Sequence, residues 1–152
     1  MSLREQLQSG IKEAMKAKMA DRLSTLRLIN AAIKDREIAG RSEAGEVEVT
    51  DSDILALLGK MVKQRLESAR AYQEGGRLEL AEKELAEIKV IEEFLPRQLT
   101  TAEVDTAIAA AIAEAGATSI RDMGRVMAVL KGKYTGQMDF GAVGTSLKGR
   151  LS

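Results

Sequence analysis

A single proline, Pro96, interrupts a chain of 152 residues in which apolar side chains recur every three or four positions. That spacing places apolar residues on one face of an α-helix. Proline is the residue least compatible with a helix interior, and aromatic residues make up only 3% of the chain. The backbone is therefore free to be helical almost throughout, and the sequence predicts an all-α protein.

Four helices are predicted before Pro96. The first carries an apolar stripe over residues 3–19, and the second starts near Asp21, a candidate N-cap. Residues 41–49 are polar and acidic without helical periodicity, which predicts a loop. Cap-forming residues at 50–53 start the third helix.

The third and fourth helices are separated by Gly75 and Gly76, and a tight turn between two long helices predicts an antiparallel pair. The fourth helix is acidic and is expected to stop near Leu95, because the residue before a proline avoids helical geometry.

After Pro96 the segments are shorter and richer in glycine. Thr100 with Glu103 and Ser119 with Asp122 have the spacing of a capping box, so each pair predicts a helix start. Residues 132–138 are expected to form a loop, after which Asp139 caps the last helix. The prediction is a four-helix N-terminal domain, residues 1–95, followed by a small three-helix bundle, residues 98–152.

The composition excludes several kinds of chemistry. The chain has no Cys and no His, so thiolate nucleophiles, disulfides, histidine-ligated metals and Ser–His catalysis are absent. The acidic pairs Asp51/Asp53 and Glu92/Glu93 are explained by a helix start and by a solvent-facing helix surface. We therefore predict no catalytic residue, no metal and no cofactor.

The beginning of the sequence lacks the basic and apolar regions of a signal peptide. The longest purely apolar run, residues 107–113, is much shorter than the roughly 20 residues of a membrane span. The expectation from these features is a soluble cytoplasmic protein with no membrane contact.

Charge is unevenly distributed although the net charge is zero. Basic residues outnumber acidic ones at both ends of the chain, and acidic residues dominate the middle. The last 32 residues contain six basic side chains, which are expected to face solvent: Arg121, Arg125, Lys131, Lys133, Lys148 and Arg150. These side chains could form one face that contacts nucleic-acid phosphates, or they could simply make a small helical module soluble.

Residues 122–151, DMGRVMAVLKGKYTGQMDFGAVGTSLKGRL, resemble the C-terminal domain of the GatB/YqeY family. The residues that fit its pattern are Met123, Gly124, Val126, Met127, Leu130, Lys131, Gly136, Asp139, Val143, Leu147, Lys148 and Leu151. Residues 14–38 and 63–99 are similar to the stand-alone YqeY branch, so the resemblance covers nearly the whole chain.

The resemblance implies a role for the two domains. In the tRNA-dependent amidotransferase, the helical tail of the B subunit helps to hold the tRNA body, and a separate domain is catalytic. This chain resembles the tail and its preceding helical domain, with Lys131 and Lys148 as matching residues and Arg125 as a matching basic position. The resemblance also implies an association with carbon–nitrogen ligase activity that uses glutamine as amido-nitrogen donor. No residue of this sequence supports that activity by itself.

Two functions are therefore expected as alternatives. The first is a non-catalytic module that associates with tRNA or other structured RNA and is accessory to amide transfer on charged tRNA. The second is a protein–protein adaptor without RNA binding, which would use the acidic helix of residues 77–95 or the apolar stripe of the first helix. An enzyme acting on its own is the least supported reading.

Overall fold

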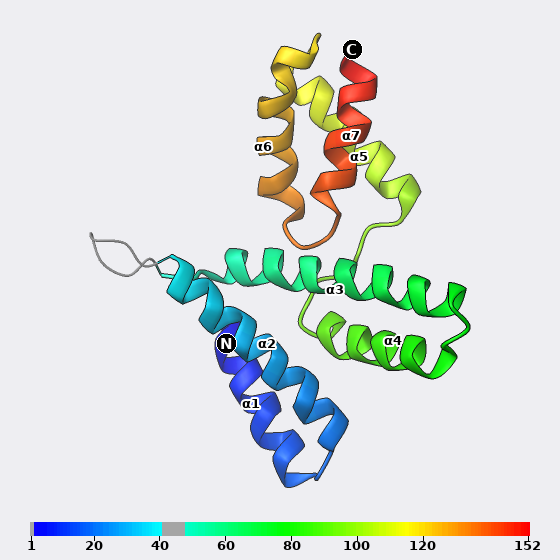
Figure 1. The fold of residues 1–152 in the computed structure, drawn as a ribbon. Coiled ribbons are helices and arrows are strands. Elements are labelled where there is room, and N and C mark those ends of the chain that lie inside the picture. The colour runs from blue at the N-terminus through cyan, green and yellow to red at the C-terminus, as the bar shows by residue number, and fades with distance from the viewer. Residues whose placement is uncertain (1, 41–47) are drawn as a thin grey trace. The chain divides into compact units, whose positions relative to one another are not determined.

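A computed structural model of the chain describes residues 2–40 and 48–152 (Figure 1). These residues form seven α-helices and one 3-10 turn without any strand, so the all-α prediction is confirmed. The elements are α1 (Leu3–Lys16), α2 (Ala20–Ala39), α3 (Asp51–Glu74), α4 (Leu78–Glu92), α5 (Thr101–Ala115), η1 (Ile120–Asp122), α6 (Met123–Tyr134) and α7 (Phe140–Leu151). No helix in this part of the chain is long and apolar enough to cross a membrane.

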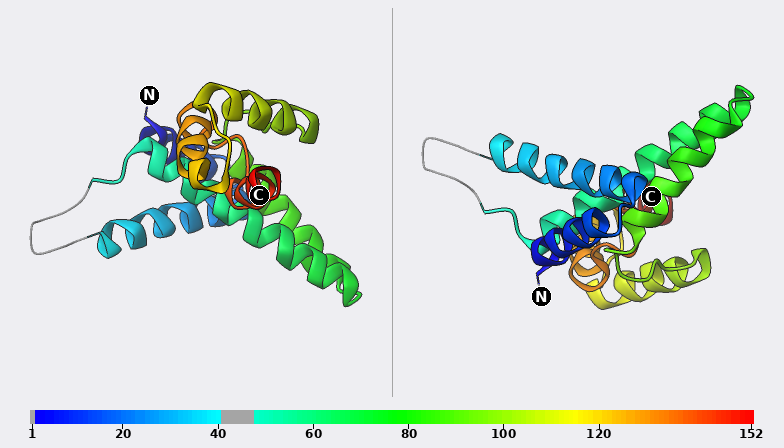
Figure 2. Two further views of the ribbon diagram at one scale, coloured as in Figure 1. Left: turned by 90° about the horizontal axis from the view of Figure 1, so that it is seen from above. Right: turned by 90° about the horizontal axis from the view of Figure 1, so that it is seen from below.

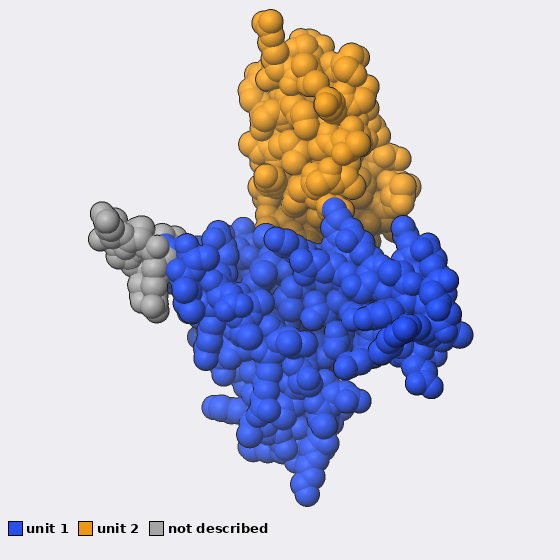
Figure 3. All heavy atoms as spheres, viewed as in Figure 1, with its two compact units in different colours: residues 1–95 blue, residues 96–152 orange. Residues whose placement is uncertain are grey.

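The chain divides into two compact units, unit 1 (residues 1–95) and unit 2 (residues 96–152), which Figure 3 colours separately. Unit 2 begins two residues before the predicted 98. Arg97 belongs to it because the guanidinium binds Glu103 and the Arg97 carbonyl accepts a hydrogen bond from Gln137 Nε2 at 3.1 Å.

Unit 1 contains α1 to α4. The longest helix, α3, starts with a capping box in which Thr50 and Asp53 each satisfy the other's backbone N–H. It lies antiparallel beside α4 in all views (Figures 1 and 2), joined by a tight turn in which Gly76 has a φ of 75°. The pair is crosslinked by Arg65 and Glu87, whose Nε and Oε2 atoms are 3.0 Å apart.

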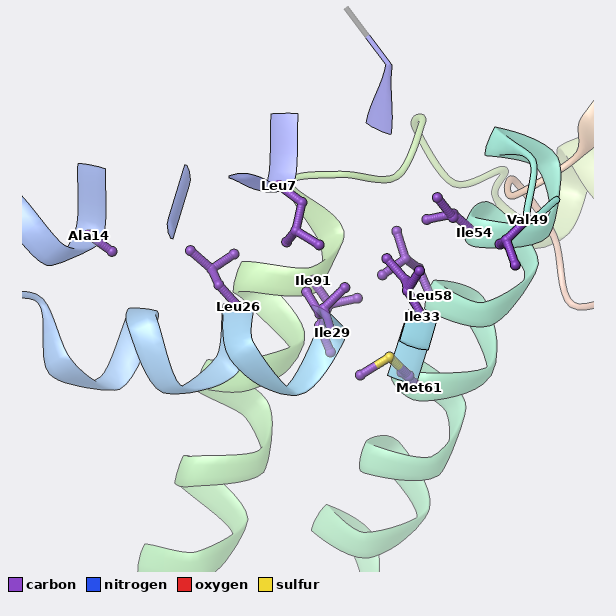
Figure 4. Close-up of a cluster of buried hydrophobic side chains, with 10 residues drawn as sticks. All are labelled: Leu7, Ala14, Leu26, Ile29, Ile33, Val49, Ile54, Leu58, Met61 and Ile91. Carbon is purple, nitrogen blue, oxygen red and sulfur yellow. The ribbon is translucent and has the colours of Figure 1, made fainter. Parts of the chain in front are cut away.

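The core of unit 1 brings all four helices together (Figure 4). Its most buried members include Leu26 and Ile29 of α2, Leu58 of α3 and Ile91 of α4. Val49 also enters this core, although the sequence predicted a loop over residues 41–49. Residues 41–47 of that predicted loop lie outside the described residues.

The junction between α1 and α2 differs from the prediction. Helix α2 begins at Ala20, and its N-cap, Met19, makes no side-chain hydrogen bond, so the assignment of Asp21 as N-cap is wrong. The turn depends instead on Lys18, whose φ of 55° reverses the chain. The end of the predicted apolar stripe is consequently exposed, with Met15 at 53% and Met19 at 51%.

Unit 2 contains α5, η1, α6 and α7 around a separate apolar core that includes Ile108, Val126, Leu130 and Leu147. Three predicted caps are present: the Thr100–Glu103 box of α5, the Ser119–Asp122 box and the Asp139 cap of α7. The second box starts the 3-10 turn η1, and α6 follows it directly.

The predicted loop of residues 132–138 is shorter than expected. Helix α6 continues through Gly132 to Tyr134, so only residues 135–139 connect it to α7. An exposed glycine in a helix lowers local helix propensity without preventing the helix, which explains why sequence reasoning ended the helix too early.

Candidate functional site

Most charges of unit 2 are paired within the unit. It contains seven Lys/Arg and five Asp/Glu side chains. Four acidic residues are bound by cations in the pairs Arg97–Glu103, Arg125–Asp122, Lys133–Glu114 and Arg150–Asp105. The fifth, Asp139, accepts hydrogen bonds from the first backbone N–H groups of α7. The charge that unit 2 presents to a partner therefore comes mainly from its other cations.

Three of the six predicted binding residues belong to these pairs. Lys133 Nζ lies 2.6 Å from Glu114 Oε2, and Arg150 Nη2 lies 2.9 Å from Asp105 Oδ1. Glu114 raises the pKa of Lys133 by hydrogen bonding and charge attraction. The pairs lie on the surface, where such contacts are worth little and exchange readily for other partners.

Asp122 organises the start of α6. The N–H groups of Thr118 and Ser119 donate to its carboxylate, and Arg125 binds its other oxygen. The Thr118 hydrogen bond, with the bond from Arg125 next, lowers the pKa of Asp122 to about 2. Arg125 is thus held in a local structural role, although its side chain remains 63% exposed.

The other three predicted residues, Arg121, Lys131 and Lys148, are exposed and make no ion pair with any residue that the structure describes. Arg121 belongs to η1, which packs against α7. Lys148 lies on α7 one turn after Gly144, the residue that faces the Met123 side chain. Arg121 and Lys148 therefore lie toward the same end of unit 2.

The six basic residues do not share one face. Helices α6 and α7 run antiparallel (Figure 1), so Lys131, near the end of α6, lies toward the opposite end of the pair from Lys148. Lys131 and Lys133 are two residues apart on a helix, a spacing that turns side chains to nearly opposite sides. Arg121 lies in the 3-10 turn η1 and Arg125 in α6, so the two residues do not share one continuous α-helical face.

A groove in unit 1 was not foreseen from the sequence. It has a volume of about 440 Å³ and lies between α2 and α3, which diverge in Figure 2. Its lining residues are Leu28, Ala32, Asp35, Arg36, Leu57, Lys60, Met61, Gln64 and Arg65. The spacing of these residues is helical on both segments, but the sequence does not encode the angle between the two helices, on which the groove depends.

The described residues contain no group of three or more acidic side chains arranged to hold a metal ion. Every buried side-chain nitrogen or oxygen among them has a hydrogen-bond partner. The described surface thus offers exposed cations on unit 2 and an apolar groove on unit 1 as its candidate binding features.

Comparison with known proteins identifies relatives. The sequence matches the family described as Yqey-like protein over residues 4–151. It is 37% identical over 94 residues to "Altered inheritance of mitochondria protein 41, mitochondrial" of Clavispora lusitaniae, which covers 62% of this chain and 52% of that protein. The protein of the same name from Pyrenophora tritici-repentis is 32% identical over 132 residues, covering 84% of this chain and 70% of that protein.

A third relative of that name, from Meyerozyma guilliermondii, is 36% identical over 89 residues, which cover 59% of this chain and 44% of that protein. The chain thus spans about half the length of two of these three relatives.

The expectation of a cytoplasmic location is wrong by this comparison, because these relatives are named as mitochondrial proteins. The features behind that expectation were the lack of a signal-peptide pattern at the beginning of the sequence and the lack of a long apolar run. Neither feature distinguishes the cytoplasm from a mitochondrial compartment, because proteins of both locations can lack a signal-peptide pattern and a long apolar run.

Proposed function

The chain belongs to the YqeY-like protein family, and from that premise we propose that it is a non-catalytic module that associates with structured RNA. The observation that carries this proposal is the charge of unit 2 after internal pairing. Its acidic side chains are occupied by ion pairs or a helix cap, whereas Arg121, Lys131 and Lys148 remain exposed and unpaired within the described chain.

The partner that fits this arrangement is a folded RNA, with tRNA as the form we propose. Phosphate contacts need exposed cations, and unit 2 supplies three, with Arg121 and Lys148 toward one end of the unit and Lys131 toward the other. Single-stranded RNA is usually bound through aromatic stacking, and this chain has two Phe, two Tyr and no Trp. Exposed cations at both ends of unit 2, without stacking side chains, favour the recognition of backbone shape.

We place this module in an accessory role in amide transfer on charged tRNA. The resemblance of unit 2 to the tRNA-holding tail of the amidotransferase B subunit supports that role. Glutamine hydrolysis requires an activated nucleophile, and this chain has neither Cys nor His. A catalytic partner would therefore supply the chemistry.

The test is a titration of labelled, folded tRNA with the full chain at several salt concentrations. Three phosphate contacts predict that the logarithm of affinity falls with the logarithm of salt with a slope of about −2 to −3. Replacing Arg121, Lys131 and Lys148 together by Glu should abolish this binding while circular dichroism stays unchanged, because the three side chains are exposed.

A matched control changes the same number of charges elsewhere. Lys12, Lys16 and Lys34 are exposed on α1 and α2 of unit 1, and their joint replacement by Glu should leave tRNA affinity within about twofold of the wild type. Equal loss in both triple variants, or wild-type binding that ignores salt, contradicts the proposal.

The second candidate is a protein–protein adaptor, and a specific observation favours it. Helix α4 is acidic yet exposes Leu78 by 61%, Leu80 by 40% and Leu85 by 36%. Apolar contacts of this kind persist at moderate salt, whereas phosphate contacts weaken steeply. If the chain binds no tRNA even at low salt, that result favours the adaptor function over RNA binding.

A further inference from the structure

The groove between α2 and α3 in unit 1 has an apolar floor that is continuous with the core. Met61, only 6% exposed, belongs both to the groove lining and to the core cluster of unit 1 (Figure 4). Leu28 of α2 is 44% exposed, and Ala32 and Leu57 are half-buried. These four side chains form a strip along the two helices that no other described element covers.

The shape of this strip suits a helix. Small molecules are usually bound in cavities that bury most of their surface, whereas this groove is more open than enclosed. Two diverging helices present ridges and a groove into which a third helix can pack. An amphipathic helix does this with apolar residues at positions i, i+3, i+4 and i+7.

The side chains at the rim of the groove are mostly basic, which favours an acidic helix. Arg36, Lys60 and Arg65 line the rim, against one carboxylate, Asp35. Arg65 is held in place by Glu87 and by the Met61 carbonyl, to which Nη1 donates at 3.3 Å. Lys60 is exposed and makes no ion pair among the residues described.

We propose that this groove is a docking site for an acidic amphipathic helix of another protein. The apolar side chains of that helix would cover Leu28, Ala32, Leu57 and Met61, and carboxylates flanking its apolar stripe would meet Arg36 and Lys60. This surface lies in unit 1, so it is separate from the RNA-binding residues proposed on unit 2.

The experiment measures binding of a designed peptide by fluorescence anisotropy with the full chain. The probe is a capped, labelled 20-residue helix with Leu at i, i+4, i+7 and i+11 and Glu at the flanking positions. A second peptide has Lys in place of every Glu. We expect the acidic peptide to bind at least tenfold more tightly, with affinity that declines as salt is added.

Two variants and two matched controls locate the contact. Leu28→Gln should weaken acidic-peptide binding about tenfold, because burial of that leucine is lost. Lys60→Glu should weaken it at least threefold. The controls should change affinity less than twofold. They are Leu66→Gln, at a comparably exposed leucine on the opposite side of α3, and Lys34→Glu, on the far face of α2.

Several outcomes would overturn the proposal. They are equal affinity for the two peptides, no binding of the acidic peptide, or equal effects of the groove variants and their controls. Sedimentation showing a dimer that Leu28→Gln dissolves would assign the groove to a second copy of this chain. Loss of tRNA affinity on Lys60→Glu, without loss of peptide binding, would assign the rim to RNA instead.

Discussion

Glu103 shows how much structure one side chain can organise in a small helical unit. Its two carboxylate oxygens accept from Arg97 Nη1 at 2.9 Å and Nη2 at 2.8 Å, and one of them also accepts from the Thr100 N–H at 3.0 Å. The same residue thus closes the capping box of α5 and fixes the segment that begins unit 2. The hydrogen bonds from Arg97, followed by the one from Thr100, lower its pKa to about 2.

The first prediction follows from that pKa. Carboxyl NMR of the full chain should show Glu103 titrating near pH 2, well below the ordinary value of about 4.3 for Glu. Arg97→Met should raise this pKa toward the ordinary value, because the largest cause of the shift is removed. Arg121→Met, the same change at an unpaired arginine, should leave it unchanged.

The sign of the linked stability follows from the direction of the shift. A carboxyl whose pKa is lowered by folding stabilises the fold above its unfolded pKa, and this contribution is lost as the pH falls from about 4 toward 2. The difference in urea midpoint between wild type and Arg97→Met should accordingly shrink over that range. A difference that is constant from pH 7 to pH 2 would refute the role assigned to this pair.

At the scale of the helices, start signals were more predictable than turns. The capping boxes at Thr100 and Thr50 depend on residues three apart, so the sequence alone contains the whole interaction. The turn between α1 and α2 has no such signal, because it contains Lys18 with a positive φ, a conformation that few residues other than glycine adopt. Local patterns therefore missed it.

The second prediction contrasts two glycines of unit 2. Gly116 ends α5 with a φ of 62°, where a Cβ costs about 1–2 kcal/mol, so Gly116→Ala should lower the free energy of unfolding by roughly that amount. Gly132 lies inside α6 with open space where its Cβ would be. Gly132→Ala should stabilise by about 0.5–1 kcal/mol, because alanine is the better helix former.

Urea denaturation of the full chain, followed by circular dichroism, measures both changes. The opposite signs are the diagnostic result, since the sequence alone had assigned Gly132 to a loop. A neutral Gly132→Ala would indicate that α6 ends earlier than Tyr134, and a stabilising Gly116→Ala would show that the left-handed cap is absent.

At the scale of the whole molecule, the candidate site depended on contacts that sequence patterns do not encode. The partners in Lys133–Glu114 and Arg150–Asp105 are 19 and 45 residues apart. Their pairing could not be inferred from charge counts along the chain. The same holds for the groove of unit 1, because Leu28 and Leu57 share a surface only through the crossing of α2 and α3. Composition and periodicity predicted the all-α class, and the capping residues predicted the starts of α3, α5 and α7.

The third prediction concerns the division at Pro96. The core of unit 2, around Ile108, Leu130 and Leu147, contains only residues that follow Pro96, and the core of unit 1 only residues that precede it. Each unit therefore buries its own apolar side chains. We expect residues 96–152 expressed alone to be helical by circular dichroism and to unfold cooperatively, though at low stability, because so short a chain buries little of its surface.

Leu130→Ala provides the control for a specific core. Leu130 is fully buried, and its truncation should cost about 2–5 kcal/mol, enough to unfold most of the isolated fragment. In the full chain the same substitution should melt unit 2 and leave the helical signal of unit 1 largely intact, because the two cores share no residue. A fragment that remains unfolded at every salt concentration, or a full chain in which Leu130→Ala unfolds everything at once, would show that the units depend on each other to fold.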